Sequence, residues 1–181
     1  MNNRRSFIVG LRSIKISLKE KSFLKKYKPW GVILFSRNVK NIKQTFQLTS
    51  SIRKIFNDRK YPILIDQEGG RVNRLEKIIS FDNLTSEFFG NKYLKNHKEF
   101  KLFYKLFIDK TSFLLKSIGA NINTVPVLDL KNKGSSNIIG NRSFSNDPKI
   151  VSKIGDYCIQ FYHQNNIGSV IKHLPGHGLA K

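Results

Sequence analysis

Short apolar runs recur along the chain, each rich in Ile, Val, Leu or Phe and followed by polar or charged residues. Runs of this length and composition are typical of strands that are buried on both faces of a parallel sheet. The pattern therefore predicts five strands, at 7–11, 31–35, 62–65, 121–128 and 169–171.

Between these runs the apolar residues recur at a helical spacing of three or four positions. The last helical segment opens with Asn146, Asp147 and Pro148, in which a capping side chain precedes a proline suited to a first turn. A lysine-rich segment at 18–28 has the same spacing. The other predicted helices carry these stripes: Ile42, Phe46, Ile52, Ile55 and Phe56; Phe100, Phe103, Phe107, Leu114 and Ile118; Ile150, Ile154, Cys158, Phe161 and Tyr162.

The alternation of strand and helix predicts an α/β fold with a parallel sheet and right-handed crossovers. Two architectures fit, an open doubly wound sheet and part of a TIM (β/α)8 barrel, and both bind ligands at the carboxyl ends of their strands. No G-x-G-x-x-G follows the first strand and no P-loop motif occurs, so nucleotide binding has no support. Polar clusters follow four of the predicted strands, at 36–38, 66–71, 129–142 and 172–173.

The composition is strongly basic. The 181 residues include 33 Lys and Arg against 12 Asp and Glu, which gives a formal net charge of +21. Such an excess raises the hypothesis of a nucleic-acid binder. The excess is concentrated in residues 1–60, where lysines alternate with apolar positions in the helical pattern of 18–28. That arrangement is typical of a solvated helix face, so we expect no nucleic-acid partner.

Two further features bear on the compartment. No stretch approaches the roughly 18 apolar residues of a membrane-spanning helix. The single cysteine, Cys158, excludes a disulfide framework. We therefore expect a soluble, cytoplasmic protein with no membrane partner.

Two carboxylates, Asp66 and Glu68, follow the third predicted strand and have two interpretations. Retaining glycosidases hold two carboxyl groups about 5–5.5 Å apart, so one hypothesis is a catalytic pair. The alternative, which we favour, is one ligand-binding aspartate and one glutamate that pairs with Arg71 or Arg74.

His173 and His177 raise the hypothesis of a metal site, since they lie four residues apart. Pro175 and Gly176 stand between them and prevent the regular helix that would place both rings on one face. No further cluster of ligand residues lies nearby in the sequence, so we expect no metal and no other cofactor.

Five strings of residues, taken together, resemble family 3 glycoside hydrolases in order and spacing, and most of all the bacterial β-N-acetylhexosaminidase branch. The resemblance extends over about residues 5–178, and five strings in register are much more specific than any one alone. The strings are GVILFSRN at 31–38, IDQEGGRV at 65–72 followed by Arg74, PVLDL at 126–130, IGNRSF at 139–144 and KHLPGHG at 172–178.

This resemblance implies a TIM barrel and retaining hydrolysis of terminal β-linked N-acetylglucosamine through a covalent glycosyl-enzyme. It also implies a muropeptide or oligosaccharide substrate and a role in peptidoglycan recycling. The residue types suit a sugar, because a carboxylate accepts hydrogen bonds from hydroxyl groups while Arg, Lys and His donate to hydroxyl oxygens. Carried over position by position, the sugar-binding residues are Asp66, Arg74, Arg142, Lys172 and His173.

The catalytic groups of that family have no counterpart in these residues. Its acid/base histidine stands in an Asp-Ser-His string shortly after the Pro-Gly-His-Gly segment, and its nucleophile is an aspartate on a later strand. The sequence stops at Lys181, before both. We therefore expect residues 1–181 to be the N-terminal portion of a single barrel domain, with five of the eight strands and no catalytic residue of its own.

Such an incomplete barrel would expose its first and fifth strands as open edges, which favours self-association. Two alternatives to the hydrolase remain open. One is a noncatalytic sugar-binding or decayed remnant, and the other is a β-glucosidase of the same family. Leu174 replaces the Phe usual in the family, a change that keeps an apolar contact.

Overall fold

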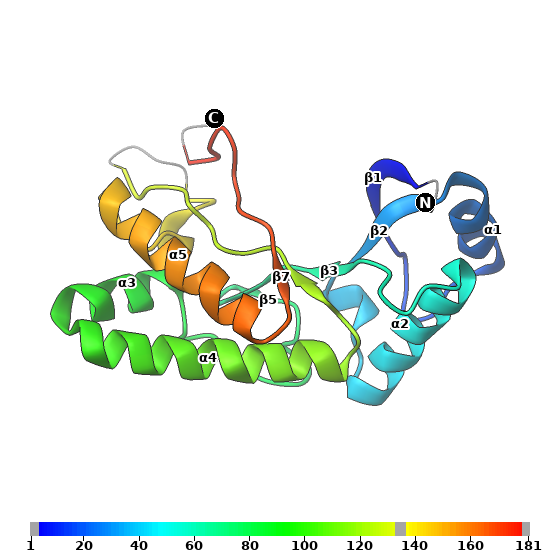
Figure 1. Cartoon of the computed structure of the whole chain (residues 1–181), viewed down its shortest axis with the longest axis horizontal. Coiled ribbons are helices and arrows are strands. Elements are labelled where there is room, and N and C mark those ends of the chain that lie inside the picture. Colours follow the sequence, from blue (N-terminus) through cyan, green and yellow to red (C-terminus); the bar gives the residue numbers. More distant parts are fainter. Residues whose placement is uncertain (1–3, 133–136, 179–181) are drawn as a thin grey trace.

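The computed structural model describes residues 4–132 and 137–178, and its main feature is a five-stranded parallel sheet (Figure 1). The strands lie side by side in their order along the chain. A doubly wound sheet reverses its strand order at a switch point, whereas the wall of a barrel keeps it. The strands are β1 (Arg5–Gly10), β2 (Pro29–Leu34), β3 (Ile63–Ile65), β6 (Ile122–Asn123) and β7 (Gly168–Ser169), with β1 and β7 at the edges.

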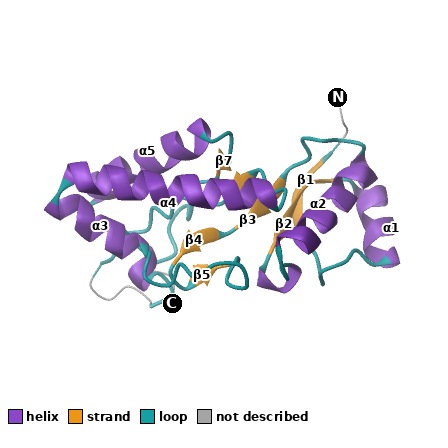
Figure 2. Ribbon diagram, turned by 90° about the horizontal axis from the view of Figure 1, so that it is seen from below, coloured by secondary structure: helices purple, strands orange, loops and turns teal. Residues whose placement is uncertain are grey.

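The helices form two groups (Figures 1 and 2). Those near β1 and β2 pack on each other at one end of the molecule, and the other three pack together at the opposite end. None of the helices in the described ranges is long and apolar enough to cross a membrane. They are α1 (Leu18–Tyr27) and α2 (Ile42–Phe56), then α3 (Ser86–Lys95), α4 (His97–Ser117) and α5 (Pro148–Gln164), with short 3-10 helices η1 (Ser36–Asn38) and η2 (Gly140–Arg142).

Side-chain caps start the helices where the sequence indicates. Ser17 accepts a hydrogen bond from the backbone N–H of Glu20, whose carboxylate accepts one from the N–H of Ser17, which makes a capping box for α1. Asp147 caps α5 in front of Pro148, as predicted. The lysines of α1 are exposed, so the interpretation of this segment as a solvated helix face is confirmed.

An aromatic core holds the second group of helices together. The rings of Phe89 and Tyr104 lie 4.7 Å apart between centroids, and Phe107 lies 5.1 Å from Phe89. Burying each of these rings contributes about 1.5–3 kcal/mol to folding. Cys158 belongs to this core as well, and burial raises the pKa of its thiol to about 12. The single cysteine is therefore a small apolar core residue.

One predicted strand is shorter than expected. Of the run 121–128, only Ile122–Asn123 forms a regular strand. Pro126 has no N–H to donate and interrupts the ladder. Pairing then resumes beyond it, because Lys172 donates its N–H to the carbonyl of Pro126 at 3.1 Å and accepts from the N–H of Leu128 at 2.6 Å. This resumed pairing fixes the backbone position of Lys172 at the end of the sheet.

A β-hairpin and one helix were not predicted. Residues 67–73, expected to be a loop, form the antiparallel hairpin β4 (Gln67–Gly69) and β5 (Val72–Asn73), stabilised by a buried hydrogen bond of 2.9 Å between the side chains of Gln67 and Asn73. Helix α3 was also missed. A side chain at Gly90 of this helix would place its Cβ 1.8 Å from the carbonyl oxygen of Phe144, so glycine lets the segment that carries η2 approach closely.

Candidate functional site

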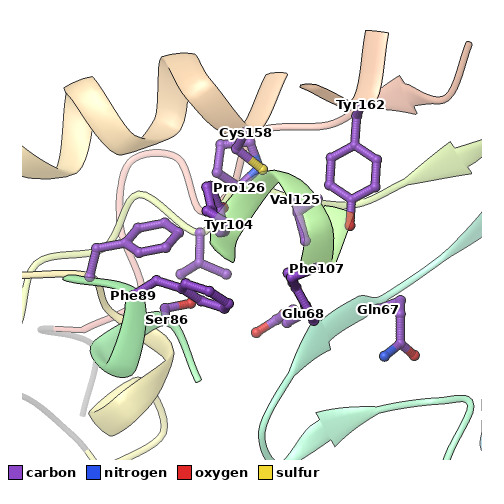
Figure 3. Close-up of a pocket in the computed structure, with 12 residues that line it drawn as sticks. Gln67, Glu68, Ser86, Phe89, Tyr104, Phe107, Val125, Pro126, Cys158 and Tyr162 are labelled. Atoms are coloured by element: carbon purple, nitrogen blue, oxygen red, sulfur yellow. The ribbon is translucent and has the colours of Figure 1, made fainter. Parts of the chain in front are cut away.

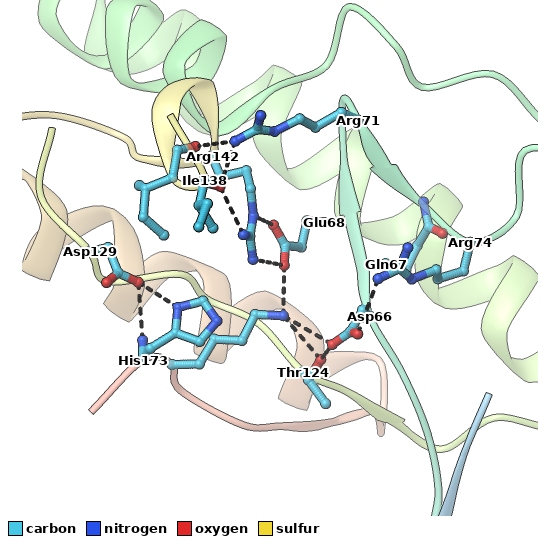
Figure 4. Close-up of polar contacts among 12 residues, drawn as sticks. Asp66, Gln67, Glu68, Arg71, Arg74, Thr124, Asp129, Ile138, Arg142 and His173 are labelled. Carbon is cyan, nitrogen blue, oxygen red and sulfur yellow. Dashed lines mark hydrogen bonds and ion pairs between the residues drawn. The ribbon is translucent and has the colours of Figure 1, made fainter. Parts of the chain in front are cut away.

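The polar residues that follow three neighbouring strands meet at the carboxyl edge of the sheet. Asp66 follows β3, Thr124 follows β6 and Lys172 lies beyond β7. The Lys172 ammonium lies 3.0 Å from Asp66 Oδ1 and 3.3 Å from Thr124 Oγ1, and the Thr124 hydroxyl donates to the same carboxylate (Figure 4). The parallel register of the strands thus places a carboxylate, a hydroxyl and an ammonium within contact of each other.

Glu68, on the β4–β5 hairpin, joins Arg142 to this group. The Arg142 guanidinium donates to both oxygens of Glu68, at 2.8 and 2.9 Å, and Lys172 Nζ lies 2.6 Å from Glu68 Oε1 (Figure 4). The Glu68 side chain is only 3% exposed. A bidentate guanidinium–carboxylate pair fixes both partners geometrically, so Glu68 orients two of the predicted sugar-binding residues.

Glu68 lies beside apolar side chains (Figure 3). Its side chain reaches a small pocket whose other walls include Phe89, Phe107 and Val125. A carboxylate beside an apolar core loses most of its hydration, and the ion pairs with Arg142 and Lys172 offset that loss.

Arg74 approaches the other side of Asp66. Its guanidinium lies 3.5 Å from Asp66 Oδ2 and 5.7 Å from the ring centroid of Phe35, which follows β2. Its Nε is buried and has no hydrogen-bond partner in the described ranges. Arg74 is therefore less tightly held than Arg142, whose guanidinium makes a bidentate pair with Glu68.

His173 is fixed by a different carboxylate. Asp129, 1% exposed, accepts from His173 Nδ1 at 2.6 Å and from the backbone N–H groups of His173 and His177 at 3.2 and 2.6 Å. The two imidazole rings lie edge to face with centroids 5.2 Å apart. The described residues contain no group of three or more His, Cys, Asp or Glu side chains placed to hold a metal ion.

The surroundings of these groups shift their pKa values. Burial raises the pKa of Asp66, but the hydrogen bond from Thr124 and the charge of Lys172 outweigh burial and leave it below its usual range. The Glu68 carboxylate raises the pKa of Arg142, more than burial lowers it. The Asp66 carboxylate is therefore ionised at neutral pH and lies in contact with Lys172, an arrangement that suits a polar, hydroxyl-rich ligand.

All five predicted sugar-binding residues lie at this edge, but Glu68 does not have the partners predicted for it. We expected Glu68 to pair with Arg71 or Arg74, and this is wrong: it pairs with Arg142 and Lys172. Arg71 instead donates to backbone carbonyls of the loop before η2, at 2.6 Å for Asn137. The sequence places Arg71 and Arg74 close to Glu68, while its true partners lie 74 and 104 positions further along the chain.

Two residues of the site were missed, Thr124 and Asp129. Thr124 stands within the run 121–128 that is typical of a buried strand, whereas Asp129 opens the polar cluster 129–142 but was given no role of its own. A signal existed for Asp129, since an acidic residue directly after an apolar run of a parallel sheet lies at the ligand-binding edge.

The sequence of this chain is similar to those of known proteins. Residues 6–181 match the family described as the glycosyl hydrolase family 3 N-terminal domain. The chain belongs to this family. Among curated relatives, a beta-hexosaminidase of Hydrogenovibrio crunogenus is 36% identical over 172 residues, which are 94% of this chain and 47% of that protein. The resemblance noted in the sequence is thereby confirmed.

Solved structures share the fold. NagZ from Neisseria gonorrhoeae, solved in complex with N-trifluoroacetyl-D-glucosamine, matches with a TM-score of 0.84 and 27% identity over 97% of this chain and 52% of that one. The beta-N-acetylglucosaminidase from Thermotoga maritima matches with a TM-score of 0.74 and 25% identity, over 97% of this chain and 34% of that one. The α/β fold predicted as part of a barrel is confirmed, and the chain spans about half the length of the beta-hexosaminidase it matches.

Proposed function

We propose that this chain forms the N-terminal part of a single family 3 barrel domain that hydrolyses terminal β-linked N-acetylglucosamine with retention of configuration. The proposal rests on one observation: the Lys172 ammonium contacts both Asp66 and Glu68 at the carboxyl edge of the sheet. Glu68 also forms an ion pair with Arg142. The names of the relatives, beta-hexosaminidase and beta-N-acetylglucosaminidase, support an amino sugar over glucose.

The proposed sugar site divides its work by hydrogen-bond chemistry. Asp66 accepts hydrogen bonds from sugar hydroxyl groups, while Lys172 and the two arginines donate to hydroxyl oxygens. A ligand that lacked these hydroxyls would displace water from these partly buried groups without replacing its hydrogen bonds, which costs about 1–3 kcal/mol for each group left unsatisfied. Selection for a sugar therefore follows from groups that are already held in place by each other.

The chemical step needs groups that we place outside these 181 residues. Retaining hydrolysis requires a nucleophile and a proton donor on opposite sides of the glycosidic bond. Asp66 and Glu68 are poorly suited to these roles, because Lys172 contacts both carboxylates and Glu68 is almost fully buried. We therefore propose that a later part of the barrel supplies both catalytic groups, and that the 181 residues bind sugar without turning it over.

The substrate that we propose is a muropeptide or related oligosaccharide with a terminal N-acetylglucosamine, and the setting is cytoplasmic peptidoglycan recycling. The support is the resemblance to the bacterial β-N-acetylhexosaminidase branch. The first alternative is a noncatalytic or decayed remnant, and the second is a β-glucosidase of the same family.

Calorimetric titration of the purified chain with N-acetylglucosamine and, separately, with glucose tests the proposal. We expect saturable heat with the amino sugar and weaker binding of glucose, together with no sustained hydrolysis of an aryl β-N-acetylglucosaminide. Tighter binding of glucose would favour the glucosidase. A folded chain that binds neither sugar would favour a decayed remnant, and sustained hydrolysis would show that the catalytic groups lie within the 181 residues.

A further inference from the structure

The buried carboxylate of Asp129 receives three hydrogen bonds from a single turn. Of the five predicted sugar-binding residues, it contacts His173 and, among the described residues, none of the rest. His173 reaches Oδ2 twice, through its backbone N–H at 3.2 Å and its ring Nδ1 at 2.6 Å. The backbone N–H of His177 reaches Oδ1 at 2.6 Å. Figure 4 shows the His173 ring with Asp129 on one side and Glu68 on the other.

The charge of Asp129 decides which nitrogen of His173 carries the proton. Burial raises the pKa of Asp129, but the hydrogen bonds from His177 and His173 outweigh burial and leave it below its usual range. Asp129 is therefore an ionised carboxylate at neutral pH, and such a group only accepts hydrogen bonds. A contact of 2.6 Å between Nδ1 and Oδ2 then requires the proton on Nδ1.

We infer that Asp129 is a positioning residue, which holds His173 in the Nδ1–H tautomer and so presents Nε2 as a hydrogen-bond acceptor for a ligand hydroxyl. In a neutral imidazole with the proton on Nδ1, Nε2 carries a lone pair. The His173 side chain is 29% exposed, and within the described residues nothing hydrogen-bonds Nε2. The tautomer follows from the contacts alone, whereas the use of Nε2 by a sugar rests on the proposed function.

The site otherwise has few hydrogen-bond acceptors. Arg74, Arg142 and Lys172 can only donate, and Asp66 already accepts from Thr124, Lys172 and Arg74. Each sugar hydroxyl both donates and accepts, so a site built from cations alone leaves hydroxyl protons without partners. Nε2 of His173 adds a second acceptor beside Asp66, in place of the donor role that the sequence suggested for this histidine.

The same residue joins two loops of the site. The carbonyl of Asp129 accepts from the Ser143 hydroxyl at 2.6 Å, and Ser143 directly follows Arg142. Its carboxylate holds the turn 173–177, in which Gly176 has φ 134°, a conformation that side chains rarely allow. Substitution of the carboxylate alone therefore tests the turn and the tautomer while leaving the contact with Ser143 in place.

Long-range nitrogen–proton NMR spectra of the four histidine rings, recorded at neutral pH without sugar, test the tautomer directly. We expect His173 to show a protonated Nδ1 and a bare Nε2 in the wild-type chain. In the nearly isosteric D129N variant the amide can donate to Nδ1, so we expect the proton on Nε2 instead. The control H177A keeps the backbone N–H and should leave the His173 tautomer unchanged. A wild-type His173 with its proton on Nε2, or a D129N spectrum with the proton still on Nδ1, would overturn the inference.

Sugar titration of the same variants separates this inference from the proposed function. Loss of one hydrogen bond to the ligand corresponds to roughly tenfold weaker binding, which we expect for D129N with N-acetylglucosamine. A wild-type chain that has the Nδ1–H tautomer but binds no sugar would contradict the proposed function and leave the tautomer established. D129N that switches tautomer yet binds as tightly as wild type would overturn the role of Nε2 as an acceptor for sugar.

Discussion

The ammonium group of Lys172 lies between the carboxylates of Asp66 and Glu68, 3.0 Å from an oxygen of the first and 2.6 Å from an oxygen of the second. These residues come from three different parts of the chain, the end of β3, the β4–β5 hairpin and the segment beyond β7. Because Lys172 is only 14% exposed, its charge matters for folding as well as for binding.

Replacing Lys172 with methionine should destabilise the chain by about 1–3 kcal/mol, because Asp66 and Glu68 keep their buried charges and lose a shared partner. Urea unfolding followed by circular dichroism measures the change. The control is K92M, which removes an ion pair to the half-exposed Glu99 and should cost less than about 1 kcal/mol. Equal losses in the two variants would contradict the importance of the buried contact.

Stability should fall at acidic pH. Asp66 and Asp129 both have a pKa below the usual range in the folded chain. Their contribution is therefore complete above the unfolded-state pKa of about 4, and it is lost as the pH falls through the lower folded values. We expect the free energy of unfolding to decrease below about pH 4. The difference between wild type and D129N should shrink over the same range, and a difference that grew on acidification would contradict this.

The thiol of Cys158 should be unreactive in the folded chain, since burial raises its pKa to about 12 and leaves almost no thiolate at mildly alkaline pH. Titration with an aromatic disulfide reagent before and after denaturation measures this. We expect reaction only after unfolding. Rapid labelling of the native chain would show that the packing of α5 on α4 is looser than in the structure.

Open sheet edges should make the chain associate as its concentration rises. Beyond β7, Val170 and Ile171 are 39% and 44% exposed, and on the opposite edge Ile8 of β1 is 44% exposed. Sedimentation velocity over a concentration series should show oligomers. I171K should reduce association, because a charged residue discourages edge-to-edge pairing, whereas K153Q on the solvent face of α5 should leave it unchanged. A monomer at every concentration would contradict the expectation.

The order of strands and helices could be predicted from the sequence because each buried strand is a short apolar run. Each long helix has apolar residues at helical spacing along one face. The hairpin after Asp66 could not, since its strands are stabilised by buried Gln67 and Asn73 rather than by apolar alternation. The five predicted sugar-binding residues came from the family resemblance. The partners of Glu68 lie far away in sequence, and only the sheet register brings Lys172 to it.

The central claim is that the group around Lys172 is a sugar site. Calorimetric titration of N-acetylglucosamine into wild type, D66N and the surface control D156N on α5 tests it most directly. We expect saturable binding by wild type and D156N, and at least about tenfold weaker binding by D66N, because residue 66 would lose its charge as an acceptor. Equal affinity for D66N and wild type, with both chains folded, would contradict the account.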